Sequence, residues 1–342
     1  MSQFFPTGAA PQPRRLPRAL LWLPGAILFA LFVALVARIG EGEQFLRLVR
    51  NARPSWLLGA LVLQALTYLC AAGAWQRLFE RSGAPSPPLR RLASLSLARA
   101  YTDRAVPPGG LGGAEVFVCG LERRGIHRSL ATSAMLFDLA TYYAAYVTAL
   151  ALSLLVLWSH CYVNRSVLGL AALFTVLSVG MPFGLAWMHR RGAGTMPAIL
   201  RRMPGLSELL HAVERAPTGF MRDPALFAEG VLLQLAIFVL DASTLYLCLL
   251  ALGIHANIGL AFASFVMASV VATLSLLPGG LGSFEWAALA MLGLLGIPVE
   301  AAFMSTLLLR GLTCWLPMAP GFFASRRALH GGGDLIRSSA RS

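Results

Sequence analysis

The chain has 342 residues, of which 57% are hydrophobic and 13% are charged, whereas about 25% of residues are charged in a typical soluble protein. Apolar runs of about 20 residues recur along the sequence, which predicts an all-α polytopic membrane protein. The net charge is +13 and all 28 basic residues are arginine, so Schiff-base lysine chemistry and a P-loop are excluded.

The arginines lie mostly in short connections between apolar runs. This distribution fits anionic lipid headgroups at the cytoplasmic surface better than it fits nucleic acid. The five cysteines are scattered without a CxxC spacing, and most fall in or beside apolar runs. The sequence therefore predicts no disulfide framework, no metal site and no cofactor.

The predicted elements alternate between long apolar spans and shorter pieces. In chain order they are a polar tail at 1–18, spans at 19–37 and 55–79, short pieces at 92–106 and 111–121, and spans at 129–158 and 166–188. A basic segment at 189–223, with an amphipathic helix at 199–213, leads to a span at 224–252, short pieces at 258–277 and 284–297, a last span at 301–323 and a tail at 326–342. We expect about seven or eight transmembrane helices, with the short pieces as broken or re-entrant helices.

Two related motifs organise this pattern. Residues 108–115 read PGGLGGAE, and residues 278–285, which begin 170 positions later, read PGGLGSFE. Proline removes a backbone donor and glycine permits close backbone approach, so each motif is expected to break a helix. Such breaks in corresponding places of two hydrophobic halves indicate a transporter-type binding site, with both motifs near the midplane. The alternative is that both are Gly/Pro loops at the membrane surface.

The arginine distribution predicts the topology, because basic connections remain in the cytoplasm. Both tails and residues 77–91, 123–128 and 190–222 are placed in the cytoplasm. Residues 159–165 and 253–257 then face outward, as does the basic connection at 38–53, which runs against the rule. The first motif then enters the membrane from inside and the second from outside. A single transmembrane domain at 19–325 would thus contain inverted repeats at about 89–158 and 255–323.

Several charged residues lie within apolar sequence, where each costs roughly 2.5–3.5 kcal/mol and requires a partner or a cavity. They are Glu115, Asp138, Asp241, Glu285 and Arg310. The repeat register brings Asp138 and Arg310 to nearly equivalent points of the two halves. We therefore expect Asp138 to pair with Arg310 in the empty site, and a phosphate to displace the carboxylate from the arginine fork.

At these motifs the sequence resembles the lysylphosphatidylglycerol synthase transmembrane family, the flippase-like domain of the multiple peptide resistance factor and its stand-alone relatives. The resemblance spans about residues 55–327 and rests on PGGLGGAE, PGGLGSFE, the Arg123-Arg124-Gly125 loop, Asp138, Gly296-Ile297-Pro298 and the Arg310 to Pro317 ending. In the family's first motif an arginine often follows the Gly-Glu pair closely. Here no arginine follows Glu115 until Arg123.

The resemblance implies lipid translocation in the bacterial plasma membrane rather than aminoacyl transfer, because the chain ends about 20 residues after its last span. The lipid would be an anionic or aminoacylated phospholipid, or a polyprenyl- or hopanoid-type lipid. A membrane-embedded transferase with a lipid-linked donor and a scaffold for a lipid-modifying complex are the alternatives. The candidate substrate-binding residues are Pro108, Gly109, Gly110, Gly112, Glu115, Asp138, Pro278, Gly279, Gly280, Gly282, Glu285, Arg310, Arg99 and Arg104, with no catalytic residue.

Overall fold

The computed structural model describes residues 53–83, 86–105, 112–163, 165–191, 223–275 and 277–330. The predicted span at 19–37, residues 108–111 of the first motif and the predicted amphipathic helix at 199–213 lie outside these ranges. The described part of the chain is helical, which confirms the predicted all-α class.

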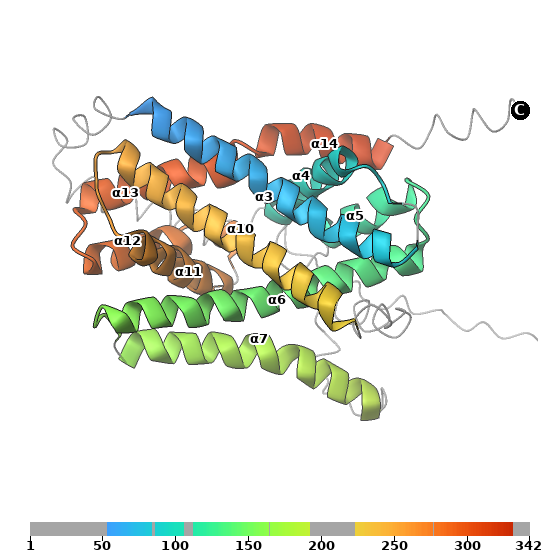
Figure 1. The fold of residues 1–342 in the computed structure, drawn as a ribbon, viewed down its shortest axis with the longest axis horizontal. Helices are drawn as coiled ribbons and strands as arrows, with labels where there is room; N and C mark the ends of the chain where they lie inside the picture. The colour runs from blue at the N-terminus through green and yellow to red at the C-terminus, as the bar shows by residue number, and fades with distance from the viewer. Residues whose placement is uncertain are drawn as a thin grey trace, which may run out of the picture.

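The helices follow the apolar runs closely (Figure 1). They are α3 (Pro54–Arg81), α4 (Leu89–Ala105), α5 (Gly112–Glu122), α6 (Arg128–Ser159), α7 (Arg165–Arg191), α10 (Pro224–Ala251), α11 (Ile258–Leu274), the 3-10 turn η3 (Pro278–Gly280), α12 (Ser283–Leu294), α13 (Val299–Arg310), the π-turn η4 (Gly311–Trp315) and α14 (Met318–His330). Both predicted pairs of short pieces are helices, and each pair lies on either side of a glycine motif.

The last span differs from the prediction of one continuous helix at 301–323. It is interrupted at η4, where the Leu316 N–H donates to the Gly311 carbonyl, five residues earlier, at 2.8 Å. Pro317 has no N–H to donate to the Thr313 carbonyl, which accounts for the widened turn at this point. The π-turn begins directly after Arg310, so it lies next to the charged residue of this span.

Four helices of the described residues are long and apolar enough to cross a membrane: α3, α6, α10 and the stretch Val299–Arg326. A helix of 28 residues is about 42 Å long, which exceeds the hydrocarbon thickness of about 30 Å. The prediction was seven or eight such helices. Within the described ranges, α11, α12 and residues Arg165–Ser178 of α7 are shorter apolar helices.

The long helices α3 and α10 pack against each other, and α10 also contacts α6 and α11 (Figure 1). The pair α4 and α5 packs against α14 at one end of the molecule, whereas α11 and α12 lie together at the other end. One hydrophobic cluster, around Trp75 and Phe117, joins α3, α4, α5 and α6. A larger cluster, around Tyr146 and Phe238, joins α6, α7, α10 and α11.

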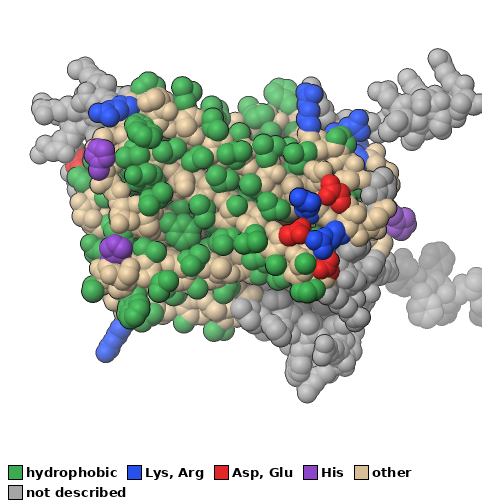
Figure 2. All heavy atoms as spheres, viewed as in Figure 1, with side chains coloured by type: hydrophobic (Ala, Val, Ile, Leu, Met, Phe, Trp, Pro, Cys, Tyr) green, Lys and Arg blue, Asp and Glu red, His purple; other side chains and the backbone are tan. Residues whose placement is uncertain are grey.

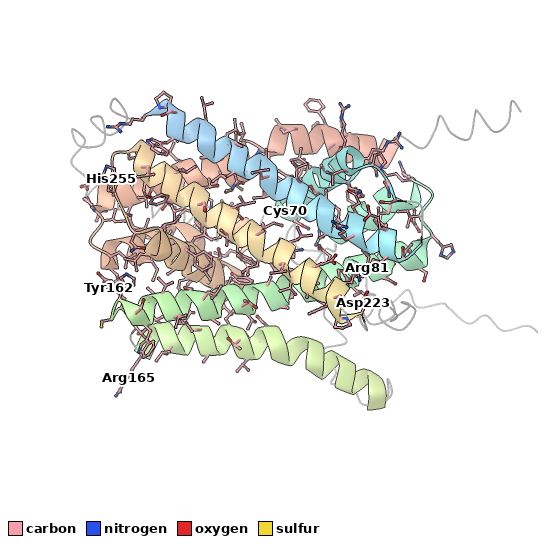
Figure 3. All side chains as sticks on the ribbon, viewed as in Figure 1. Cys70, Arg81, Tyr162, Arg165, Asp223 and His255 are labelled. Carbon is pink, nitrogen blue, oxygen red and sulfur yellow. The ribbon has the colours of Figure 1, made fainter. Side chains whose placement is uncertain are left out.

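The outer face of α3 and α10 is apolar, and the charged side chains gather toward one end (Figure 2). Figure 3 shows Tyr162, Arg165 and His255 at one end of the molecule and Arg81 and Asp223 at the other. This grouping agrees with the predicted map for 159–165 and 253–257 on one side and 77–91 on the other, whereas most of 190–222 lies outside the described residues. An apolar belt between two polar ends is the surface expected for a membrane-spanning protein.

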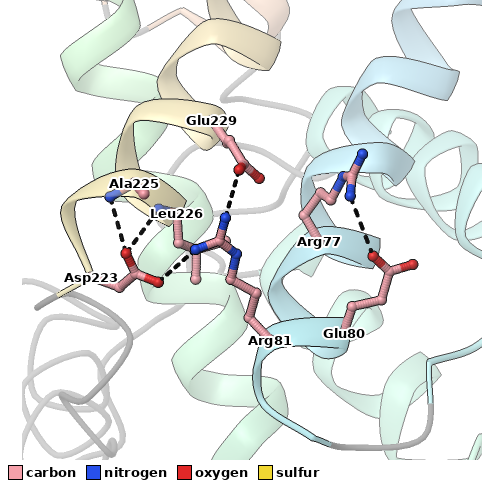
Figure 4. Close-up of polar contacts among 7 residues, drawn as sticks. All are labelled: Arg77, Glu80, Arg81, Asp223, Ala225, Leu226 and Glu229. Atoms are coloured by element: carbon pink, nitrogen blue, oxygen red, sulfur yellow. Dashed lines mark hydrogen bonds and ion pairs between the residues drawn. The ribbon is translucent and has the colours of Figure 1, made fainter.

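An ionic contact fixes α3 to α10 at the end of the molecule that carries Arg77 and Arg81, called the arginine-rich end below (Figure 4). Arg81 Nη1 donates to Asp223 Oδ2 at 2.9 Å, and Arg81 Nη2 donates to Glu229 Oε1 at 2.7 Å. Asp223 also caps α10, because its Oδ1 accepts from the N–H groups of Ala225 and Leu226 at 3.0 and 3.2 Å. The backbone N–H of Leu226 and the Arg81 guanidinium lower the pKa of the Asp223 carboxyl.

The two polar ends should lie on opposite sides of the membrane. In a protein with the native cysteines removed, we expect His255→Cys in the α10–α11 turn to react with an impermeant thiol reagent only from outside. Arg123→Cys in the α5–α6 turn should react only from the cytoplasmic side, because that end is rich in arginine. Labelling of position 255 from the cytoplasmic side alone would reverse the map.

Candidate functional site

A partly open cavity of about 420 Å³ lies between helices of the described part of the chain. Its walls come from α6, α10, α11, the second glycine motif, α12, α13 and η4. The lining residues are Tyr142, Tyr146, Ile237, Phe238, Asp241, Phe265, Ser269, Ala272, Thr273, Leu277, Gly279, Gly280, Phe284, Arg310 and Thr313. The volume is within the range of small-ligand pockets, and the lining combines aromatic rings, hydroxyl groups and one charge of each sign.

The second motif forms one wall of this cavity because its glycines leave the helical path. Gly279 and Gly280 both have φ of 62°, a left-handed conformation that favours glycine. A Cβ on Gly280 would lie 2.7 Å from the Cβ of Ala272, whereas one on Gly279 would meet nothing within 4 Å. The motif therefore interrupts the helical structure between α11 and α12, as predicted, and packs closely against α11 at Gly280.

Arg310 is held against this broken segment by three contacts. Its Nη2 donates a hydrogen bond to the Gly280 carbonyl at 3.0 Å. Its Nε forms an ion pair with Glu285 Oε1 at 2.8 Å, but the angle at the N–H group does not meet the geometry of a hydrogen bond. Its guanidinium also lies over the Phe284 ring, 4.4 Å from the centroid. Arg310 lines the cavity, so a positive charge is presented there in a fixed position.

Glu285 has a structural part in this arrangement. Its side chain is 1% exposed, and its Oε2 accepts from the Gly282 N–H at 2.7 Å. The carboxylate thus caps the start of α12 and neutralises Arg310 at the same time. A helix start of this kind can present backbone N–H donors to a phosphate. At Gly282 that donor is taken by Glu285.

The predicted pairing of Arg310 with Asp138 is wrong. Arg310 pairs with Glu285, and Asp138 forms an ion pair with Arg99, whose Nη1 donates to Asp138 Oδ2. The repeat register predicted that the two residues lie at similar depths in the membrane. It did not predict the direction in which each side chain points from its helix, which determines its neighbours. In the structure α6 packs against α10 and α11, whereas α13 packs against α12 and α10.

Asp138 joins four helices in a second charged cluster. Its Oδ1 accepts from Trp75 Nε1 and from Gln234 Nε2, each at 2.9 Å, and the side chain is 5% exposed. Arg99 lies 5.9 Å and 5.6 Å from the ring centroids of Trp75 and Phe117. This cluster connects α3, α4, α6 and α10 and lies outside the lining of the cavity among the described residues.

Asp241 is the acidic residue of the cavity, and it was not among the predicted site residues. Its Oδ1 accepts from Gln64 Nε2 at 2.8 Å, and the same nitrogen lies 3.0 Å from Thr244 Oγ1. Tyr142 and Tyr146 were also missed. The available signals were an acid inside an apolar run and two tyrosines four residues apart in another apolar span.

The structure brings some of the predicted residues together and leaves others undescribed. Gly279, Gly280 and Arg310 line the cavity, Gly282 and Glu285 lie beside it, and Arg99 and Asp138 form the separate cluster. Pro108, Gly109 and Gly110 lie outside the described residues, Gly112 begins α5, and the side chains of Arg104, Glu115 and Pro278 are not described. The described residues contain no group of His, Cys, Asp or Glu suited to a metal ion.

The corrected pairing predicts the outcome of a double-mutant cycle. Asp138→Ala should lower the free energy of unfolding by about 3–5 kcal/mol, because Arg99 stays charged and loses its buried partner. Combining it with Arg99→Met should reveal a coupling of about 1–3 kcal/mol, measured by reversible unfolding in detergent. The matched cycle with Arg310→Met should give about 0.5 kcal/mol or less. Equal couplings in the two cycles would contradict the pairing.

The two adjacent glycines allow a second comparison. Gly279→Ala should cost roughly 1–2 kcal/mol of stability, because only the left-handed conformation is unfavourable. Gly280→Ala should cost about 1–3 kcal/mol more, because its Cβ would also overlap Ala272. The difference between their thermal unfolding temperatures measures the close approach of the motif to α11. Indistinguishable temperatures would contradict that approach.

Comparisons with known proteins agree with this helical architecture. The family model described as the lysylphosphatidylglycerol synthase TM region matches residues 21–321. A phosphatidylglycerol lysyltransferase from Bacillus subtilis is 36% identical over 104 residues, which are 30% of this chain and 11% of that protein. A UPF0104 membrane protein from Methanothermobacter thermautotrophicus is 26% identical over 163 residues, 44% of this chain and 49% of that protein.

The aligned parts thus span about half or less of each relative's length. The family model, in contrast, covers most of this chain and confirms the resemblance that the two motifs indicated. The protein is a multi-pass membrane protein and belongs to the lysylphosphatidylglycerol synthase transmembrane-region family.

Proposed function

We propose that this protein is a flippase-like lipid transporter of the bacterial plasma membrane. It binds the headgroup of a membrane lipid in the cavity and passes it between the two leaflets. The lipid is an anionic or aminoacylated phospholipid, or a polyprenyl- or hopanoid-type lipid. The observation that carries the proposal is a fixed arginine at the wall of a cavity inside the membrane-spanning helices.

Arg310 favours a lipid that carries a phosphate. A guanidinium has five N–H donors in a rigid fork, which suits phosphate oxygens. The contacts described above use Nε and one donor of Nη2, so further donors are available to an anion. Because Glu285 already balances the resting charge, the phosphate adds to the pair rather than displacing the acid. This replaces the exchange with Asp138 that the sequence suggested.

The helix order supports movement by two inverted halves. The pair α4 and α5 begins and ends at the arginine-rich end, and the pair α11 and α12 begins and ends at the opposite end (Figure 1). Both pairs have a 17-residue helix followed by a shorter one. Helix α4 also contacts η3, so the first pair reaches the second motif. Opposed hairpins that meet near the midplane are the arrangement of many secondary transporters.

The relatives support a lipid as the substrate. The family description and the name of the Bacillus subtilis relative both refer to lysylphosphatidylglycerol or phosphatidylglycerol. In this proposal the Arg99–Asp138 cluster holds α3, α4, α6 and α10 together, while Arg104 and Glu115 remain candidates for contact with the lipid. Anionic headgroups at the cytoplasmic surface contact the arginine-rich end.

The test is lipid movement in proteoliposomes of purified protein that contain a fluorescent phospholipid. Arg310→Lys keeps the charge but loses the fork, and a hydrogen bond to a charged group contributes about 1.5–3 kcal/mol. We expect the variant to move lipid at least about tenfold more slowly than the wild type. Arg326→Lys is the matched control, since Arg326 also lies over a phenylalanine, at 4.7 Å from the Phe322 centroid, but outside the cavity.

A wild-type rate for Arg310→Lys would contradict the role of the guanidinium. The two alternative functions give different outcomes in the same vesicles. A membrane-embedded transferase would generate a new lipid from a lipid-linked donor, and a scaffold would neither move nor convert lipid. Either result would overturn the proposed function.

A further inference from the structure

The outer ends of α4 and α5 gather four arginines that the described part of the chain does not neutralise. Arg90 and Arg91 lie in the first turn of α4, and Arg123 and Arg124 directly follow α5. None of the four forms an ion pair with another described residue. The carboxylates near this end are paired with other arginines: Glu80 with Arg77, Asp223 and Glu229 with Arg81, and Glu122 with Arg128.

The packing of α4 on α5 brings Arg91 and Arg124 to the same level. The two helices run in opposite directions, and a Cβ on Gly120 of α5 would lie 2.5 Å from Leu95 Cδ1 of α4. Arg91 is four residues before Leu95, and Arg124 is four residues after Gly120. Each arginine therefore lies one helical turn beyond this contact, toward the arginine-rich end. Two positive charges thus lie near each other at the surface of the helix pair.

Arg124 is fixed by the turn that ends α5. Its Nη1 donates to the Gly120 carbonyl, so part of the guanidinium caps the helix. Gly125 follows with φ of 84°, and its N–H donates to the Glu122 carbonyl at 3.0 Å, which closes the turn. Burial and, after it, the charge of Arg91 lower the pKa of the Arg124 guanidinium. An anion between the two arginines would relieve this repulsion.

We propose that this arginine cluster binds the phosphate of an anionic phospholipid in the cytoplasmic leaflet, as a lipid that the protein retains and does not move. The phosphate lies between Arg91 and Arg124, with Arg90 and Arg123 beside it. A guanidinium fork matches phosphate oxygens, and basic pockets at the cytoplasmic ends of membrane helices suit such headgroups. Leu89 is 38% exposed directly before Arg90, and this apolar neighbour favours a lipid over a soluble anion.

This site is separate from the cavity, because α4 and α5 contribute none of their described residues to its lining. The proposal goes beyond the proposed function and does not depend on it. A bound lipid cancels the repulsion between Arg91 and Arg124, so it should stabilise the folded protein. Without an anion the repulsion remains, and removing one of the two charges should then cost no stability.

The test measures the thermal unfolding temperature of purified full-length protein in an uncharged detergent, with and without dioleoylphosphatidylglycerol. Arg91→Gln removes one charge of the pair and leaves the bond from Arg124 to Gly120 in place. Without lipid, the variant should unfold at the wild-type temperature or above it. With lipid, the wild type should gain about 3–5 °C more than the variant. Lipid bound in the cavity raises both temperatures equally, so the difference reports the arginine cluster alone.

Arg77→Gln is the matched control, because Arg77 is exposed at the same end and already paired with Glu80 at 3.7 Å. It should keep the full wild-type gain. Dioleoylphosphatidylcholine, which has no net charge, should give the wild type and Arg91→Gln the same temperature change. The proposal is overturned by equal gains in the wild type and Arg91→Gln, by loss of the gain in Arg77→Gln, or by an Arg91→Gln variant that unfolds below the wild type without lipid.

Inorganic phosphate distinguishes the two sources of the anion. A difference of the same size with phosphate alone would assign the cluster to a soluble anion and overturn the lipid site. The outcome is also separate from the transport measurement. If the wild type keeps its larger gain with phosphatidylglycerol but moves no lipid in vesicles, the lipid site stands and the proposed function fails. If the gains are equal while Arg310→Lys slows lipid movement, the function stands and the lipid site fails.

Discussion

The ion pair between Glu285 and Arg310 is the interaction on which the candidate site depends. Within an apolar environment, every charge and every broken backbone segment has to be satisfied by the protein or by a wet cavity. Glu285 neutralises the arginine and caps the start of α12, and Arg310 in turn donates to the carbonyl of Gly280. These three contacts together fix the turn, the helix start and the position of the positive charge.

The two halves of the molecule neutralise their charges separately. The Arg99–Asp138 pair is enclosed by donors and aromatic rings in the first half, and the Arg310–Glu285 pair lies at the broken helices of the second. Helix α10 contacts both halves and contributes Asp241 to the cavity. Neither ion pair joins a residue of 89–158 to a residue of 255–323, so a relative movement of these two segments would not separate a buried ion pair, a step that costs about 3–5 kcal/mol.

Much of the fold could be predicted, because helix ends are encoded locally. Pro54 and Pro224 mark helix starts, and the second PGGLG motif separates α11 from α12. The partners of charged residues could not be predicted, because they depend on rotation around each helix axis. Asp138 and Arg310 were identified as charges within apolar sequence that require partners, but their actual partners, Arg99 and Glu285, follow from packing alone. The π-turn at Gly311–Trp315 was also missed, although Pro317 gave a signal for it.

The most direct test of the central claim is a structure determined by electron cryomicroscopy in a lipid nanodisc that contains phosphatidylglycerol, an anionic phospholipid. The account predicts density for a headgroup inside the cavity, with its phosphate in contact with the Arg310 guanidinium and with the Glu285–Arg310 pair still intact. Headgroups found only at the membrane surface, with water alone around Arg310, would contradict the account.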